Sequence, residues 1–364
     1  MNKLEEARKT INEIDKEMAA LFVKRMEAAK LVSEYKIERG LPILDQNREN
    51  EVVAKNSAFV EDETLRSFYV NFLKDIMSVS RRYQEMLQEG LKVAYSGVEG
   101  AFANIAAKNI FPSAEQIPFG DFTSAYDSVV NGECDCAVLP LENSYAGEVD
   151  QVLDIMFQGS LYINGIYDLE VTHNLLGLPD SSIDDIKTVI SHPQALEQCA
   201  KYIKKHGFEA VRANNTAIAA QKVVESGDKS VAAIASRDTA KLYGLKVLER
   251  RINESSHNTT RFAVFSRVES IHPAKENDLR FIMVFTVRNE AGALAEAINI
   301  IGDCGFNMRS IRSRPMKDLM WKYYFYIEAD GNPYSEKGKQ MINNLSEYCD
   351  KLRIIGSFPH EKKL

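Results

Sequence analysis

Hydrophobic and polar positions divide the chain into three stretches with different periodicity. In the first stretch almost no strand pattern occurs, and apolar residues recur at helical spacing. The first helix is predicted to end at Gly40, which a proline follows after one residue. A second helix is expected after Asp45, which can cap it, and a third should end at Gly90. We therefore predict an all-α domain over residues 1–90.

The first of these helices is too long to be covered within such a domain. It extends over more than 30 residues, or roughly 50 Å at 1.5 Å per residue. Its apolar stripe contains Leu4, Ile11, Ile14, Met18, Leu21 and Phe22. A three-helix domain of about 90 residues cannot bury a stripe of that length within one chain. We therefore infer that a second copy of the chain covers it, in a homodimer or homotetramer.

From Leu91 onwards short strand-like runs alternate with helical stretches. The strand-like runs are LKVAYSG, CDCAVLPL, KTVIS, SVAAIAS and RFAVFSR, and helical segments such as ALEQCAKYIKKHG lie between them. This alternation predicts α/β layers with largely parallel sheets over residues 91–270.

A polar linker, SRVESIHPAKEND, precedes a third unit over residues 278–360. Its expected elements follow the order β-α-β-β-α-β, which is typical of an α+β, ferredoxin-like fold.

Composition limits the classes of function. At 364 residues the chain needs more than one core, and its net charge of −7 argues against a nucleic-acid or anionic-membrane binder. The N-terminal residues lack an apolar signal core, and no segment offers about 18 uncharged apolar residues, so a cytoplasmic protein is expected. The C-x-C pair Cys134–Cys136 lies in a predicted strand, where two small core residues are favoured over a metal site.

Cations on the first helix are the first candidate chemistry. Arg25 and Lys36 are three helical turns apart and share a face. Arg8 lies roughly 25 Å from Arg25 along the axis, so it can only join such a site in an antiparallel partner. Taken alone, these three cations could also be solvated surface charges.

The surrounding residues resemble the all-helical chorismate mutase family. The matching residues are Arg8, Asp15, Arg25, Lys36, Pro42, Asp45, Arg48, Glu49, Ser80 and Gln84. That reaction is an intramolecular rearrangement, which needs a dicarboxylate held in a compact chair and electrostatic help at the breaking ether oxygen.

The resemblance implies a division of the substrate contacts. The groups that would hold the carboxylates are Arg25, Ser80 and Arg8 of the partner subunit. The groups that would face the ether oxygen are Lys36 and Gln84. The groups that would meet the ring hydroxyl are Glu49, Asp45 and Arg48.

A run of hydrogen-bonding side chains, HNTTRFAVF from His257 to Phe265, leads into an apolar strand. Buried polar groups there must be satisfied structurally or serve a ligand. Together with YSGVEGAF, LPLENSYAG, ISHPQALEQC and TAKLYGL, this run resembles prephenate dehydratases over residues 91–268. The resemblance implies a two-lobed, periplasmic-binding-protein-like α/β domain with a site between lobes that close by a hinge motion.

Loss of water and carbon dioxide from prephenate needs a donor near the leaving hydroxyl and an anion clamp. The residues that the resemblance assigns are Asn143, Ser191, Gln198, Thr260, Arg261 and Phe262. Thr260 fits as a hydroxyl donor, whereas Arg261 could contact the substrate or anchor the turn. Glu142 could be a general acid or a surface carboxylate, and His192 and His257 are expected to be structural.

Two features bear on this reaction. No G-x-G-x-x-G run occurs, which disfavours a nucleotide-dependent oxidative decarboxylation of prephenate, and no metal or organic cofactor is expected. Ala101 and Ala103 stand where the family usually has hydroxyl residues. A binding module without dehydratase activity, attached to an active mutase, therefore stays open as an alternative.

The third unit contains the run NEAGALAEAINIIGDCGFNMRSIRSRP from Asn289 to Pro315. This run resembles the ACT regulatory domain, which implies L-phenylalanine as effector. The residues assigned to that site are Asn289, Gly292, Ala293, Leu294, Ser313, Arg314 and Pro315. Gly292 allows close backbone approach to a ligand, and the following helix N-terminus favours a carboxylate. Arg312 replaces the acidic residue of the family's second motif, so a dimerisation module without a ligand is the alternative. The whole chain is thus expected to be a bifunctional enzyme that acts on chorismate and prephenate.

Overall fold

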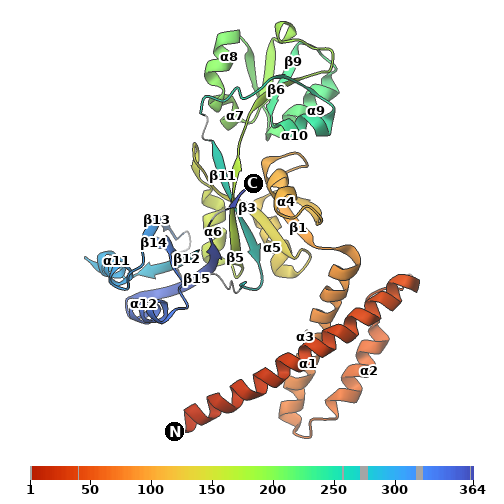
Figure 1. Ribbon diagram of the computed structural model, residues 1–364, viewed down its shortest axis with the longest axis vertical. Coiled ribbons are helices and arrows are strands. Elements are labelled where there is room, and N and C mark those ends of the chain that lie inside the picture. Colours follow the sequence, from red (N-terminus) through yellow and green to blue (C-terminus); the bar gives the residue numbers. More distant parts are fainter. Residues whose placement is uncertain (1, 40, 256–257, 271–277, 317–322, 361) are drawn as a thin grey trace. The chain divides into compact units, whose positions relative to one another are not determined.

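The computed structural model describes residues 2–39, 41–255, 258–270, 278–316, 323–360 and 362–364. The chain forms two compact units, Met1–Leu91 and Lys92–Leu364 (Figure 1).

The first unit is helical. Its helices are α1 (Lys3–Arg39), α2 (Gln46–Ser57) and α3 (Glu63–Glu89). Asp45 caps α2 by accepting a hydrogen bond from the Arg48 N–H at 3.0 Å. Gly90 follows α3 with a φ of 82°, a conformation that glycine adopts without strain. The three predicted helices, the cap at Asp45 and the end at Gly90 are confirmed.

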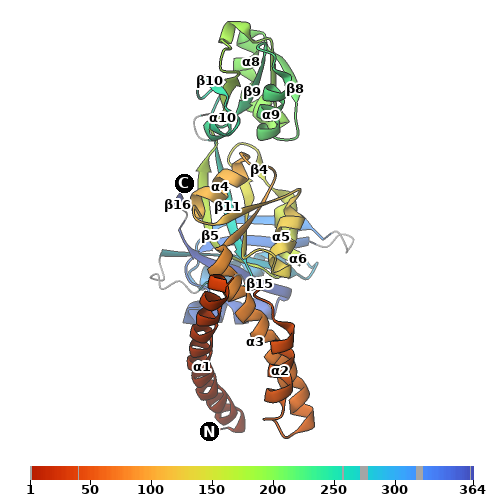
Figure 2. The same ribbon diagram turned by 90° about the vertical axis from the view of Figure 1, so that its right-hand side faces the viewer.

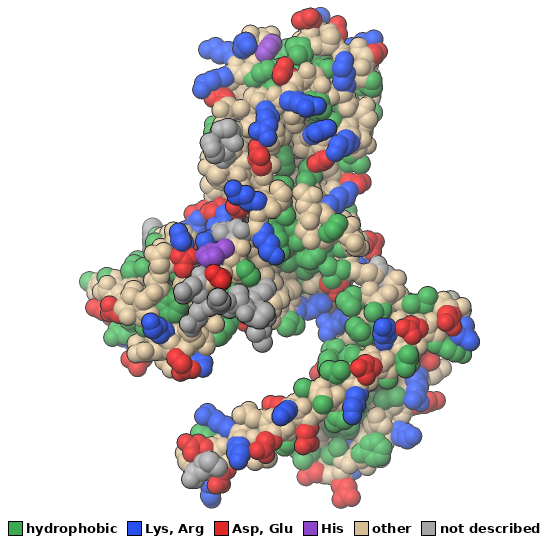
Figure 3. All heavy atoms as spheres, viewed as in Figure 1, with side chains coloured by type: hydrophobic (Ala, Val, Ile, Leu, Met, Phe, Trp, Pro, Cys, Tyr) green, Lys and Arg blue, Asp and Glu red, His purple; other side chains and the backbone are tan. Residues whose placement is uncertain are grey.

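Helix α1 has a long apolar surface that its own chain leaves exposed. Only Ala29 and Ser33 of its 37 residues are buried. The exposed hydrophobic residues include the whole predicted stripe, Leu4, Ile11, Ile14, Met18, Leu21 and Phe22. Figure 3 shows hydrophobic side chains spread over the visible face of this unit.

The second unit begins with a lobe built on a seven-stranded sheet. Its strands are β1 (Lys92–Ser96), β2 (Glu115–Phe119), β3 (Cys136–Asn143), β4 (Gly147–Glu148), β5 (Tyr162–Glu170), β11 (Thr259–Ser266) and β16 (Lys362–Lys363). The order is β16-β5-β11-β3-β1-β2, with β4 paired to β3. Its helices are α4 (Phe102–Ile110), α5 (Phe122–Asn131) and α6 (Asp150–Gln158). Cys134 and Cys136 are buried, as expected for small core residues.

A second lobe is inserted between β5 and β11. Its strands are β6 (Asn174–Gly177), β7 (Thr188–Ser191), β8 (Glu209–Arg212), β9 (Val231–Ala235) and β10 (Lys246–Glu249), in the order β10-β6-β9-β7-β8. Its helices are a 3₁₀ turn η1 (Ile183–Asp185), α7 (Pro193–Gln198), α8 (Ala200–His206), α9 (Thr216–Ser226) and α10 (Arg237–Tyr243). Figure 2 shows α8, α9 and α10 around these strands.

The prediction of largely parallel sheets is only partly right. β1 is parallel to β2 and β3, but β11 is antiparallel to both β3 and β5. In the second lobe β6 is antiparallel to β9 and β10. The first sheet is mixed because the chain leaves its lobe through β5 and returns through β11, so these strands run in opposite directions. The second sheet is mixed because β6, the strand that enters the lobe, runs opposite to β9 and β10.

The C-terminal part of the second unit has the predicted order β-α-β-β-α-β. Its elements are β12 (Leu279–Val287), α11 (Ala293–Asp303), β13 (Met308–Pro315), β14 (Tyr323–Asp330), α12 (Glu336–Ser346) and β15 (Cys349–Pro359). The four strands form an antiparallel sheet in the order β13-β14-β12-β15.

This C-terminal sheet shares a core with the first lobe. Ile282 of β12 and Tyr326 of β14 belong to the same buried cluster as residues of α5, α6 and the seven-stranded sheet. Gly356 of β15 lies so close to β5 that an added Cβ would be 2.0 Å from the Ile163 carbonyl oxygen. The terminal strand β16 then pairs with β5 at the edge of the first sheet. The C-terminal fold is therefore packed directly against the lobe that contains β11.

Candidate active sites

The helical unit contains a cavity of about 370 Å³ that collects most of the residues predicted for the mutase. The predicted residues that line it are Arg25, Lys36, Asp45, Arg48, Glu49, Ser80 and Gln84. They come from all three helices and the α1–α2 connection, although they are up to 59 positions apart in the sequence. Apolar side chains such as Val32 and Met77 complete the wall.

Hydrogen bonds fix the cations of this cavity. The Arg25 guanidinium donates to the Ser80 hydroxyl and to the Ile76 carbonyl oxygen. Burial lowers the pKa of Arg25. The Lys36 ammonium donates to the Ile43 carbonyl oxygen, which holds it at the cavity wall. Arg25 and Lys36 are therefore both held at the wall of one small cavity, as a dicarboxylate ligand requires.

Gln84 and Glu49 have neighbours that the sequence did not indicate. Gln84 Nε2 donates to the Ser80 carbonyl oxygen at 3.2 Å, and its Oε1 is buried without a hydrogen-bond partner among the described residues. Glu49 forms an ion pair with Arg81, which also lines the cavity. No sequence signal distinguished Arg81 from other helical arginines.

Arg8 does not belong to the cavity lining of its own chain. It lies on the exposed N-terminal part of α1, four helical turns or more before Arg25. This position agrees with the expectation that Arg8 cannot join the site in the same chain.

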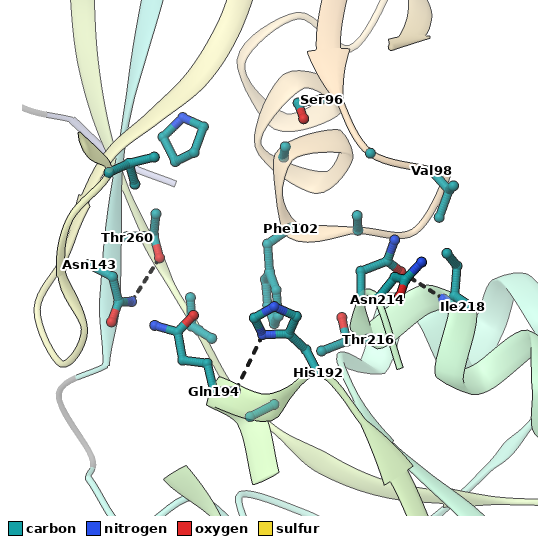
Figure 4. A pocket seen from close by; sticks show the side chains of 18 of the residues that line it. Ser96, Val98, Phe102, Asn143, His192, Gln194, Asn214, Thr216, Ile218 and Thr260 are labelled. Atoms are coloured by element: carbon teal, nitrogen blue, oxygen red, sulfur yellow. Dashed lines mark hydrogen bonds between the residues drawn. The ribbon is translucent and has the colours of Figure 1, made fainter. Parts of the chain in front are cut away.

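A larger cavity of about 630 Å³ lies in the second unit, with lining residues from both lobes. Figure 4 shows Asn143 and Thr260 on one side and His192 and Asn214 on the other. Of the predicted residues, those in the lining are Asn143, Gln198, Thr260 and Phe262. The described residues that form this lining include no Asp, Glu, Lys or Arg, so its polar groups are neutral amides, hydroxyls and imidazoles.

The pairing of β3 with β11 places Asn143 directly beside Thr260. Asn143 Nδ2 donates to Thr260 Oγ1 at 2.9 Å. Because successive side chains of a strand point to opposite faces, Thr260 and Phe262 face the cavity while Arg261 faces away. The hydroxyl predicted as a donor is therefore at the cavity wall.

His192 caps α7 at the cavity and also lines it. Its Nδ1 accepts a hydrogen bond from the Gln194 N–H at 3.3 Å, so Nε2 holds the proton in the neutral ring. Burial lowers the pKa of His192, which favours that neutral form. The structural role predicted for His192 is present, and its Nε2–H is also a neutral donor at the cavity. His257 lies outside the described residues.

Ser191 lies outside the cavity lining although the sequence assigned it to the site. Its side chain is wholly buried, and its hydroxyl donates to the Ile234 carbonyl oxygen at 2.6 Å. This bond ties β7 to β9 and leaves the hydroxyl away from the lining. In this structure Ser191 supports the sheet beneath His192.

Glu142 and Arg261 also lie outside the cavity, on the opposite face of the same two strands. Arg261 Nη1 is 2.8 Å from Glu142 and 3.0 Å from Glu328 of β14, and Glu142 also pairs with Arg312 of β13. Burial works against a high pKa for Arg261, but Glu328 and then Glu142 raise it. The alternative that Arg261 anchors structure is favoured over a substrate contact. Glu142 has no access to the cavity as a general acid, because both of its oxygens face arginines.

Ala101 and Ala103 line the cavity at the start of α4, whose N-cap residue Ala101 makes no side-chain capping bond. Backbone N–H groups at such a helix end attract anions. With alanine at both positions, this wall presents the backbone of the helix end rather than side-chain hydroxyls at 101 and 103.

The two segments predicted for the regulatory site lie toward the same end of the C-terminal sheet, on strands that β14 separates. Gly292 is the N-cap of α11 with a φ of 89°, which justifies glycine at this turn. Strand register aligns Thr286 with Tyr324 and Tyr324 with Arg314, so the turn after β12 and the end of β13 lie at the same edge. Asn289, Ala293, Leu294, Ser313 and Pro315 belong to these two segments.

Two arginines of β13 are directed to the dehydratase lobe. Arg314 pairs with Asp154 of α6 at 2.9 Å and with Asp150. Arg312, the residue that departs from the family pattern, pairs with Glu142 and Glu148. An acid at position 312 would face these two carboxylates, so the cation is matched to its surroundings in this chain.

Among the described residues, no group of three or more His, Cys, Asp or Glu side chains could hold a metal ion. Within the same residues, no helix combines the length and the hydropathy needed to cross a bilayer.

Comparisons with known proteins agree with the two cavities. The chorismate mutase type II family model matches residues 7–85, and the prephenate dehydratase model matches residues 93–270. A bifunctional chorismate mutase/prephenate dehydratase of Aquifex aeolicus is 30% identical over 366 residues, which cover 99% of this chain and 98% of that protein. An arogenate dehydratase/prephenate dehydratase of Arabidopsis thaliana is 30% identical over 88% of this chain and 87% of its own length.

A solved structure supports the same assignment for the second unit. The prephenate dehydratase of Arthrobacter aurescens in complex with L-Phe superimposes with a TM-score of 0.69 at 28% identity, over 74% of this chain and 90% of that one. The family models, the length of the match and the two cavities lead to one conclusion: this chain belongs to the bifunctional chorismate mutase/prephenate dehydratase family.

Proposed function

We propose that the helical cavity converts chorismate to prephenate and that the interlobe cavity converts prephenate to phenylpyruvate. Family membership supports both reactions. The observation that carries the second reaction is the Asn143–Thr260 pair at the wall of a cavity without charged side chains in its described lining.

In the mutase cavity, Arg25 and Ser80 would bind a substrate carboxylate as a unit, because they are already hydrogen-bonded to each other. Lys36 would place positive charge near the ether oxygen, where negative charge develops as the bond breaks. Gln84 would add a neutral donor after its amide turns from the Ser80 carbonyl oxygen. Glu49, Asp45 and Arg48 would meet the ring hydroxyl from the opposite wall.

In the dehydratase cavity, the departing ring hydroxyl needs a hydrogen-bond donor, and Thr260 supplies one. Decarboxylation supplies the electron pair that makes the ring aromatic, and the departing oxygen becomes water by taking up a proton, ultimately from solvent. Backbone N–H groups at the start of α4 and the Nε2–H of His192 would hold the carboxylates. Gln198 and Phe262 would complete the contacts.

Both reactions can be tested on one purified protein supplied with chorismate, with prephenate and phenylpyruvate followed over time. The parent is expected to produce both at neutral pH. Thr260→Val should stop the second step and leave the first unchanged, because the two cavities belong to different units. Prephenate that accumulates without phenylpyruvate in the parent would contradict the dehydratase and support an active mutase with a binding module.

We also propose that two copies of the chain form each mutase site, with Arg8 of the partner subunit as a carboxylate ligand. The exposed apolar stripe of α1 supports this proposal, since such a surface is stabilised when a second helix covers it. A mixture of Arg8→Ala and Arg25→Ala chains should regain mutase activity through hybrid sites. No recovery after demonstrated subunit exchange would contradict this role of Arg8.

We propose three domains along the chain, a mutase domain at 1–90, a dehydratase domain at 91–270 and an ACT domain over residues 278–360. Regulation by L-phenylalanine is proposed for the third. L-Phe in the Arthrobacter aurescens structure supports this effector. Gly292→Ala should weaken inhibition of phenylpyruvate formation, because its φ of 89° disfavours a side chain at the proposed site. Gly227→Ala, at a φ of 60° after α9, is the matched control and should keep inhibition. Equal inhibition of both variants would contradict the assignment.

A further inference from the structure

The direction of the Thr260 hydroxyl is set by the amide of Asn143. The backbone N–H groups of Tyr145 and Ala146 donate to Asn143 Oδ1 at 3.0 and 2.9 Å. The oxygen of the amide is thereby identified, and Nδ2 must be the atom that faces Thr260 Oγ1. Because an amide nitrogen only donates, Thr260 Oγ1 accepts this bond and its own proton is left for another acceptor. Among the described residues no acceptor for that proton is found, and the side chain lines the cavity.

The same amide is held by a buried neighbour. Asn143 Nδ2 also donates to Asn258 Oδ1 at 2.7 Å. Asn258 is 1% exposed, and its Nδ2 donates to Gln198 Oε1 at 2.9 Å. Since Oδ1 of Asn258 accepts from Asn143, only its nitrogen can face Gln198, so the orientation of one amide fixes that of the next.

His173 ends this chain of hydrogen bonds. Its Nε2 lies 2.7 Å from the same Gln198 Oε1, and an amide oxygen only accepts, so Nε2 must hold the proton. Its Nδ1 is buried without a partner among the described residues, as an unprotonated ring nitrogen allows. Burial lowers the pKa of His173 and keeps the ring neutral. With its oxygen occupied by two donors, Gln198 has its own NH₂ group left for the cavity that it lines.

We propose that Asn258 and His173 are positioning residues of the dehydration site, which hold Asn143 and Gln198 so that the Thr260 proton and the Gln198 amide point into the cavity. The inference rests on the proposed dehydratase function of this cavity. We call the hydrogen-bonded series Thr260–Asn143–Asn258–Gln198–His173 the relay. It joins the lobes, because Gln198 lies on α7 of the second lobe and Asn143 on β3 of the first. His173 and Asn258 lie in the two connections between the lobes. Donor direction is therefore linked to the relative position of the lobes.

The test compares Asn258→Leu and His173→Phe with the parent, using added prephenate as substrate. Leu and Phe are close in shape to the Asn and His that they replace, but their side chains cannot form hydrogen bonds. Each variant should lower the dehydratase kcat about tenfold, the factor that corresponds to one net hydrogen bond, with KM within about twofold. Asn164→Leu is the matched control, because Asn164 bonds to Ser266 at the far end of β11. Its kcat should equal that of the parent. Urea unfolding followed by circular dichroism checks that the second unit, which contains all three substitutions, is folded in every variant.

A double variant distinguishes positioning from general destabilisation. If Asn258 acts through Thr260, Asn258→Leu should cost less than about threefold in a Thr260→Val background, measured against a protein-free blank. Equal losses in both backgrounds, a raised KM with unchanged kcat, or a kcat equal to that of the parent would each overturn the proposal. If the dehydration rate of Thr260→Val does not exceed the protein-free blank, the proposal is judged from the kcat and KM of the single variants Asn258→Leu and His173→Phe. A parent without dehydratase activity would instead contradict the proposed function itself.

Discussion

Replacing Glu328 with glutamine should destabilise the second unit by about 3 kcal/mol. Glu328 is 1% exposed and accepts hydrogen bonds from Arg261 of β11 at 2.9 and 3.0 Å and from Arg280 of β12 at 3.0 Å. Removing one member of a buried ion pair costs about 3–5 kcal/mol, because the remaining charge is left in a poorly solvated place. The low end of this range applies, because each arginine still has another carboxylate partner in the variant. Arg261 remains paired with Glu142 at 2.8 Å and Arg280 with Asp330 at 3.3 Å.

The assay is urea unfolding of the full chain, followed by circular dichroism and by loss of dehydratase activity. Mutase activity, which belongs to the other unit, serves as an internal reference. Glu336→Gln is the control, because Glu336 is exposed and, among the described residues, its ion pair is with Lys339 in the same helical turn. It should leave the transition unchanged. A loss below about 1 kcal/mol for Glu328→Gln would refute the reasoning, because it would mean that the cluster is solvated or rearranges freely.

Three further predictions follow from single contacts. Arg25→Ala should lower mutase kcat/KM by about 100-fold or more and leave dehydration of added prephenate unchanged, which separate assays will check. Because burial lowers the pKa of His173 from 6.5, the unfolded chain binds a proton that the folded chain excludes below pH 6.5. The free energy of unfolding should thus decrease as the pH is lowered from 7 to 5. In urea titrations, His173→Gln should reduce the dependence of that free energy on pH by up to about 1.4 kcal/mol per pH unit. Gly356→Ala should destabilise the second unit by about 1–3 kcal/mol, because its Cβ would overlap the Ile163 carbonyl oxygen; an unchanged melting temperature would contradict this packing.

Much of the architecture could be predicted from periodicity and from glycine and capping residues. The helix ends at Asp45 and Gly90 and the β-α-β-β-α-β order are local signals, and the structure agrees with them. Strand direction could not be predicted, because it depends on where the chain crosses between lobes. A repeating strand–helix pattern does not contain that information.

The dehydratase site was only partly predictable for a related reason. The resemblance assigns both Thr260 and Arg261 to the site and leaves the role of Arg261 open, but adjacent residues of a strand face opposite ways, a rule that applies to the sequence alone. Asn258 belongs to the same polar run, but its part in the site cannot be predicted from the sequence, because its partners Gln198 and Asn143 are 60 or more positions away. Isolated side chains such as His173 have no sequence pattern that reveals a relay.

The two faces of β11 also restrict how this protein can change over time. A one-residue length change inside β11 that no β-bulge absorbs would exchange the faces, placing a guanidinium at the cavity and a hydroxyl beside the carboxylates that Arg261 now contacts. The partner strand β3 already has one extra residue opposite Arg261 and Phe262, so a single-residue change is compatible with activity only where such a bulge absorbs it. Alternate residues of β11 therefore serve the cavity and the contact with the C-terminal fold, so a substitution at one of these positions can alter either function without the other.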